Sequence, residues 1–96
     1  MKDCCGKKTI RSEEDKKAII NRLNRIGGQV NGIKKMIEED KYCDDVLIQL
    51  SAINKSIKSL ANILIEKHMY NCVTRELSNG NTEILSEVVD LFKRFQ

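Results

Sequence analysis

The sequence predicts an all-α protein, and three observations support that class. Proline and tryptophan are absent from the 96 residues, aromatic residues make up only 4%, and charged residues make up 32%. Apolar residues recur at spacings of three and four over long runs, which is the period of a helix and not of a strand. A chain of this length forms one domain with a limited core, and association with further chains often completes such a fold.

The first predicted helix spans residues 12–39. Ser12 is expected to begin it, because a serine hydroxyl accepts a hydrogen bond from a backbone N–H of the first turn. The acidic residues 13–15 that follow suit the positive end of the helix dipole. A seam of heptad type then runs along the helix, with members spaced alternately by four and three residues: Ile19, Leu23, Ile26, Val30, Ile33 and Ile37.

The second predicted helix runs from about residue 43 to residue 77, after a short corner at residues 40–42. It carries a similar seam, at Val46, Leu50, Ile53, Ile57, Leu60 and Leu64. Further apolar residues flank this seam, so the apolar arc is wider than one neighbouring helix can cover. Because the first helix of the same chain covers only one side, a second copy is expected on the other, in an antiparallel four-helix-bundle dimer.

A third, shorter helix is predicted after a turn at residues 78–81. Gly80 suits the left-handed conformation that ends many helices, and Thr82 is expected to cap the third helix, which extends to about residue 95. Residues 1–11 are polar, rich in lysine and aperiodic, so they are predicted to be a flexible tail. Residues 12–96 are then a single helical domain.

Cys43, His68 and Cys72 are the candidate metal ligands. His68 and Cys72 are four residues apart in a helical run and therefore share one face. Cys43 lies 25 residues before His68, which is a rise of roughly 37 Å along one straight helix and too far for one ion to bridge. Since 25 residues is close to a whole number of turns, an antiparallel pair of chains would bring Cys43 of one against His68 and Cys72 of the other.

Two thiolates and one imidazole favour Cu(I), whereas zinc normally takes a fourth ligand in a closed site. The competing interpretation is ordinary packing, since cysteine is a common core residue and a helical histidine is often only a hydrogen-bonding residue. Cys43 and His68 could also form a nucleophile–base pair across a dimer. No phosphate loop, oxyanion hole or paired carboxylates accompany them, so an enzyme is not expected.

Basic charge is concentrated at the start of the chain. Residues 1–35 hold ten Lys or Arg and four Asp or Glu, against seven and ten in residues 36–96. A basic face of this kind suits DNA, although a hydrated helix surface has the same composition. The candidate DNA-contacting residues on the first helix are Arg22, Arg25, Lys34 and Lys35, with the amides of Asn21, Asn24, Gln29 and Asn31 nearby.

Neither a membrane span nor a secretory leader is evident. No apolar run reaches the length of a transmembrane helix, and the first residues lack the apolar stretch of a signal peptide. The sequence therefore predicts a cytosolic, cytoplasmic protein whose cysteines are reduced thiols or ligands rather than structural disulfides.

The stretch RLNRIGGQVNGI at residues 22–33 resembles the R-L-x-R-x-x-G-Q-V-x-G signature of the copper-sensitive operon repressor family. Cys43, His68 and Cys72 follow in the arrangement found in that family's copper sensors. The resemblance covers about residues 12–92. It implies an all-helical dimer that pairs into a tetramer. It also implies a repressor that binds operator DNA in its metal-free form and is released by Cu(I), so that copper-resistance genes are expressed.

The resemblance also implies roles for single residues. Cu(I) would be held by Cys43 of one chain and by His68 and Cys72 of the other. Arg22 falls on an arginine that contacts DNA in the family. Tyr42 matches a tyrosine beside the metal ligands that is thought to couple the site to DNA release.

Two family positions are less well matched. The family's copper sensors carry a glutamate on the third helix beside the ligands, and an alignment without gaps places Val88 there. A gap of one residue would align Glu87, and Glu83 lies one turn earlier. A second basic, DNA-contacting position falls near Ser59, with Lys58 beside it.

Alternative functions remain open at this point. One is a persulfide- or thiol-sensing repressor of the same family, in which sulfur bridges Cys43 and Cys72 of the partner subunit. Another is a copper-buffering protein with no role at DNA, and a third is a purely structural helical dimer.

Overall fold

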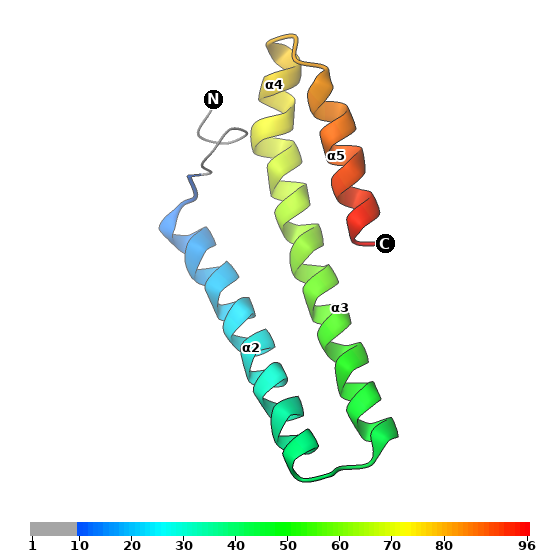
Figure 1. Ribbon diagram of the computed structural model, residues 1–96. Coiled ribbons are helices and arrows are strands. Elements are labelled where there is room, and N and C mark those ends of the chain that lie inside the picture. Colours follow the sequence, from blue (N-terminus) through cyan, green and yellow to red (C-terminus); the bar gives the residue numbers. More distant parts are fainter. Residues whose placement is uncertain (1–9) are drawn as a thin grey trace. The chain divides into compact units, whose positions relative to one another are not determined.

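A computed structural model describes residues 10–96, and these residues form helices without a strand (Figure 1). The elements are α2 (Glu13–Glu38), α3 (Cys43–His68), the π-helical turn η1 (Met69–Val73), α4 (Thr74–Ser78) and α5 (Glu83–Arg94). The predicted all-α class is confirmed. The predicted tail, residues 1–11, lies outside the described residues except for its last two.

The chain is organised as two compact units, whose boundary falls within α3. One unit is Ser12–Leu60, and the other contains Ala61–Gln96. The first unit therefore holds α2 and the larger part of α3, and the second holds the end of α3 together with η1, α4 and α5. No helix within residues 10–96 is long and apolar enough to cross a lipid bilayer.

Local hydrogen bonds explain where α2 begins and ends. The Asp15 N–H donates to the Ser12 hydroxyl at 3.1 Å, so the predicted cap is confirmed. At the other end Asp40 adopts a φ of 54°, a left-handed conformation that aspartate tolerates better than most residues. The Asp40 N–H then donates to the Ile37 carbonyl at 3.1 Å and the Lys41 N–H to the Met36 carbonyl at 2.9 Å, which closes the helix end.

Alternate members of the two seams differ in burial, and the difference repeats every seven residues. In α3 the buried members are Val46, Ile53 and Leu60, whereas Leu50 and Ile57 are 46% and 42% exposed. In α2 the half-buried members are Ile19, Ile26 and Ile33, whereas Leu23, Val30 and Ile37 are exposed. The chain by itself therefore covers only one half of each seam.

The second predicted helix is not one uninterrupted α-helix, and this prediction was wrong in that detail. After His68 the backbone makes a π-helical turn, Met69–Val73, before the short α4 resumes. The Thr74 N–H and the Thr74 hydroxyl both donate to the Met69 carbonyl, the hydroxyl at 2.8 Å. This pair of bonds holds the wider turn, because a threonine hydroxyl competes for carbonyls of the preceding turn. Single π-turns inside helices are frequent at functional sites.

Gly80 ends α4 in the predicted left-handed conformation, with a φ of 87°. Its N–H donates to the Leu77 carbonyl at 3.0 Å, and the Asn81 N–H donates to the Glu76 carbonyl at 2.9 Å. The Asn81 side-chain amide adds a bond of 2.8 Å to the Glu76 carboxylate. These contacts set the turn from which α5 departs.

Thr82 precedes α5 but does not cap it through its side chain, contrary to the prediction. Its backbone is already helical, with φ −81° and ψ −13°, whereas a capping side chain needs an extended backbone to reach the N–H groups of the first turn. α5 is instead held by burial: Ile84 and Val88 form a buried cluster with Val73 of η1.

Two glycine substitutions should have opposite effects on stability. Gly80→Ala should lower the free energy of unfolding by about 1 kcal/mol, because alanine is strained at a positive φ. Gly28→Ala should raise it by up to about 1 kcal/mol, since Gly28 lies inside α2 and a Cβ there meets no atom within 4 Å. Urea unfolding followed by circular dichroism measures both. A Gly28→Ala protein less stable than the wild type would contradict the open surface at this glycine.

Candidate functional site

Cys43 and Tyr42 are presented together at the start of α3. Cys43 is the first residue of the helix, and its thiol is free and exposed. Tyr42 is 68% exposed. Its carbonyl accepts hydrogen bonds from the N–H groups of Asp45 at 3.1 Å and Val46 at 3.2 Å, which begin the helix. The backbone of this corner is therefore fixed while both side chains remain accessible.

His68 and Cys72 lie on either side of the start of the π-helical turn. His68 is the last residue of α3 and is half-buried, whereas Cys72 lies within η1 and is only 1% exposed. The Cys72 sulfur takes part in a disulfide in this structure, which differs from the expectation of reduced cysteines. Its thiolate can therefore serve as a metal ligand only after reduction.

The three candidate ligands do not converge within one chain. Cys43 and His68 are the two terminal residues of α3, and a regular helix of that span separates them by roughly 37 Å. Within residues 10–96, no group of three or more His, Cys, Asp or Glu residues is placed to hold a metal ion. A site that uses all three residues needs more than one copy of the chain.

The two candidate carboxylates of α5, Glu83 and Glu87, make no polar contact with the candidate ligands within the described residues. Glu83 and Glu87 are exposed and, within the described residues, neither makes an ion pair or hydrogen bond to His68 or Cys72. Val88 is 4% exposed and belongs to the buried cluster. Val88, the position that an alignment without gaps reaches, therefore packs in the core, whereas Glu83 and Glu87 both have exposed carboxylates.

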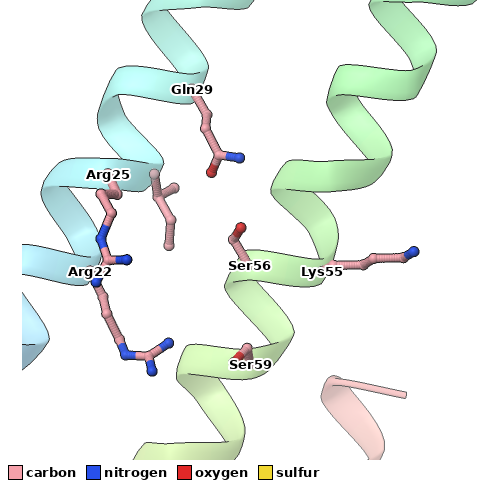
Figure 2. Close-up of a pocket in the computed structure, with 7 residues that line it drawn as sticks. Arg22, Arg25, Gln29, Lys55, Ser56 and Ser59 are labelled. Atoms are coloured by element: carbon pink, nitrogen blue, oxygen red, sulfur yellow. The ribbon is translucent and has the colours of Figure 1, made fainter.

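A pocket of about 540 Å³ lies between α2 and α3, within the unit Ser12–Leu60. Its lining residues are Arg22, Arg25, Ile26 and Gln29 from α2, and Lys55, Ser56 and Ser59 from α3. Figure 2 shows the Arg22 side chain extending toward Ser59 and that of Gln29 extending toward Ser56. The Lys55 side chain points away from α2, so its ammonium group lies outside the space between the helices (Figure 2).

The pocket gathers only some of the residues predicted to contact DNA. Arg22 and Arg25 line it, whereas Lys34, Lys35 and Lys58 do not. Within residues 10–96, Lys16 pairs with Glu13 and Lys41 pairs with Glu39, and no described carboxylate forms an ion pair with Arg22 or Arg25.

Sequence reasoning did not single out Lys55 or Ser56 of α3 as parts of this site. Gln29 was named only as a nearby amide, although it lies seven residues after Arg22. That spacing places both residues on one helix face and is a signal that could have identified Gln29. No comparable signal marks an isolated serine.

Known proteins that are similar in sequence to this chain are metal-sensing transcriptional repressors. Residues 15–94 match the model of a family described as metal-sensitive transcriptional repressors. The copper-sensing transcriptional repressor CsoR of Bacillus subtilis is 44% identical over 86 residues, which cover 88% of this chain and 85% of that protein. The copper-sensing transcriptional repressor RicR of Mycobacterium tuberculosis is 52% identical over 59 residues, which cover 62% of each chain.

Two solved structures share the fold. The Cu(I)-bound copper-sensing repressor CsoR of Geobacillus thermodenitrificans aligns with a TM-score of 0.83 and 39% identity, over 90% of this chain and 91% of that one. The nickel-responsive transcriptional regulator InrS aligns with a TM-score of 0.72 and 35% identity, over 91% of this chain and 99% of that one.

The two candidate cysteine ligands should differ in reactivity. In fully reduced protein, iodoacetamide should modify Cys43 at least about tenfold faster than Cys72, because a buried thiol is poorly accessible to the reagent. Peptide mass spectrometry over a time course gives the rate of modification of each cysteine separately. Labelling in urea gives the rate for each thiol in the unfolded chain. Equal native rates would contradict the burial of Cys72.

Proposed function

The chain belongs to the family of metal-sensitive transcriptional repressors, and from this premise we propose that it is a copper-responsive repressor. In its metal-free form it binds operator DNA, and Cu(I) binding releases the DNA so that copper-resistance genes are expressed. The observation that carries the proposal is the donor set: Cys43, His68 and Cys72 occur in a chain that shares its fold with a Cu(I)-bound repressor. Relatives named as repressors support a regulatory role rather than an enzymatic one.

The metal centre in this proposal is shared between two chains. Cys43 of one subunit and His68 and Cys72 of the partner subunit provide two thiolates and an imidazole, a soft set of low coordination number that suits Cu(I). The separation of Cys43 from His68 along α3 supports a shared site, and so does the absence of a metal-binding cluster within residues 10–96 of one chain. Tyr42 and Glu87 are the residues expected beside the ligands.

The open halves of both seams support the same assembly. A second chain that packs antiparallel against α2 and α3 would cover the exposed members of both seams, of which Leu50 and Ile57 are examples. Such a dimer is a four-helix bundle, and the family resemblance implies that two dimers pair into a tetramer. A repressor of this kind acts in the cytoplasm.

Operator DNA is held by basic residues of α2 together with Lys58 of α3. Arg22 and Arg25 present guanidinium groups that no described carboxylate neutralises, and Lys34, Lys35 and Lys58 add further positive charge. Because phosphate contacts release counterions, the affinity for DNA should fall steeply as salt rises. Cu(I) is then an allosteric ligand that prefers the conformation without DNA.

The direct test is an anaerobic Cu(I) titration of reduced protein against a high-affinity chelator, followed by fluorescence anisotropy on promoter DNA. We expect about one Cu(I) per chain and release of the DNA at that ratio. Ni(II) is the metal control, because a nickel-responsive regulator shares the fold. DNA retained at saturating Cu(I) would contradict the proposal. A stable mass increase on sulfide-donor treatment, with His68 dispensable, would then favour a thiol sensor of the same family.

Metal response and DNA binding should be separable by substitution. Cys43→Ala should abolish release by Cu(I) while operator affinity stays within about twofold of the wild type, because the substitution removes a metal ligand without changing the basic face. Arg22→Ala should weaken operator binding by at least about tenfold and leave the copper stoichiometry unchanged. Arg75→Ala, which removes an exposed arginine of α4, is the matched control. Loss of both functions in either variant would show that the roles are not separate.

A further inference from the structure

The π-helical turn η1 joins two of the candidate metal ligands. His68 is the last residue of α3, and Cys72 lies within η1. The turn is closed by hydrogen bonds from Thr74 to the carbonyl of Met69, the residue that follows His68 directly. The backbone between the two ligands is therefore almost entirely π-helical, and η1 sets the position of one ligand relative to the other.

The kind of helical turn decides how the two ligand side chains lie around the helix axis. Four residues complete slightly more than one turn of an α-helix, about 1.1 turns. They complete less than one turn of a π-helix, whose hydrogen bonds join residues five apart rather than four. Conversion of η1 to an α-helix would therefore move Cys72 around the axis relative to His68. A metal site tolerates little movement of this kind, because metal–ligand bonds are short, about 2.0–2.3 Å for zinc with nitrogen or sulfur.

The hydroxyl of Thr74 favours the π form of this turn. It donates to the Met69 carbonyl, five residues earlier, at 2.8 Å, and hydroxyl bonds to oxygen are most often about 2.7–2.8 Å long. By contrast, Ser56 and Ser78 lie in α-helices and donate to carbonyls four residues earlier, each at 3.1 Å. A hydroxyl at position 74 therefore makes a shorter bond in the π-helical turn than comparable hydroxyls of this chain make in an α-helix.

We propose that Thr74 is a positioning residue of the Cu(I) centre. It does not bind the metal, because its hydroxyl is directed to the Met69 carbonyl. By holding η1 in its π form, it keeps His68 and reduced Cys72 at the relative rotation in which both bind one ion. This role rests on the proposed copper-repressor function and adds to it a residue outside the donor set.

The test is Thr74→Val, which removes the hydroxyl and keeps the branched shape of the side chain. In reduced protein, anaerobic chelator competition should show a Cu(I) affinity roughly tenfold to a hundredfold below that of the wild type, the loss typical of groups that orient metal ligands. X-ray absorption at the copper edge should count fewer sulfur donors per ion than in the wild type, because Cys72 is the ligand that moves. Thr74→Ser, which restores a hydroxyl, should recover both the affinity and the sulfur count.

Ser78→Ala is the matched control, because it removes a hydroxyl-to-carbonyl bond from α4 without removing a bond that closes the π-helical turn. It should keep the Cu(I) affinity within about twofold of the wild type, since a hydroxyl bond of this kind contributes little to a helix. Urea unfolding followed by circular dichroism separates a loss of folding from a loss of metal binding.

Three results would overturn the positioning role and leave the repressor function standing. They are an unchanged Cu(I) affinity in Thr74→Val, an equal loss in Ser78→Ala, and a Thr74→Ser protein that recovers nothing. A reduced wild-type protein that binds no Cu(I) would overturn both.

Discussion

The length of α3 is the constraint on which the rest of the account depends. The helix begins at Cys43 and ends at His68, so its regular rise holds the two side chains roughly 37 Å apart. A helix of this kind does not bend enough to bring its ends to one metal ion. A centre built from these residues therefore has to be completed by a second chain, and metal binding then depends on assembly. The same helix forms one side of the basic pocket, so the sites proposed for metal and DNA share one element.

The pattern of burial along the apolar seams of α2 and α3 also requires a second chain, independently of the metal ligands. Val46, Ile53 and Leu60, which are seven residues apart along α3, are buried, while the intervening members Leu50 and Ile57 remain exposed. A stripe of apolar side chains left open along two adjacent helices is costly in water and favours association. The partner needed to cover the stripe and the partner needed to supply the missing ligands are, in the proposed dimer, the same chain.

Local chemistry made most of the fold predictable, and the failures have physical reasons. Ser12 and Gly80 set helix ends through their own hydrogen bonds and backbone conformation, so those ends were predicted correctly. The π-helical turn escaped prediction because it leaves the apolar pattern nearly unchanged and involves a single threonine, Thr74, whose backbone N–H and hydroxyl both donate to the Met69 carbonyl. The ligands were identified by residue type and spacing. The convergence of the ligands and the contacts of the basic residues with DNA stay predictions. The sequence pattern of one chain does not specify how two chains pack against each other.

A subunit-mixing measurement tests the shared metal centre most directly. A Cys43→Ala chain and a chain carrying both His68→Ala and Cys72→Ala each lack part of every site, so each alone should bind no Cu(I) tightly. Unfolded together and refolded, they should form mixed dimers with one complete site each, or about one Cu(I) for every four chains when pairing is random. Cu(I) retained by either variant alone, or none bound by the mixture, would contradict a centre built from Cys43 of one subunit and His68 and Cys72 of the other.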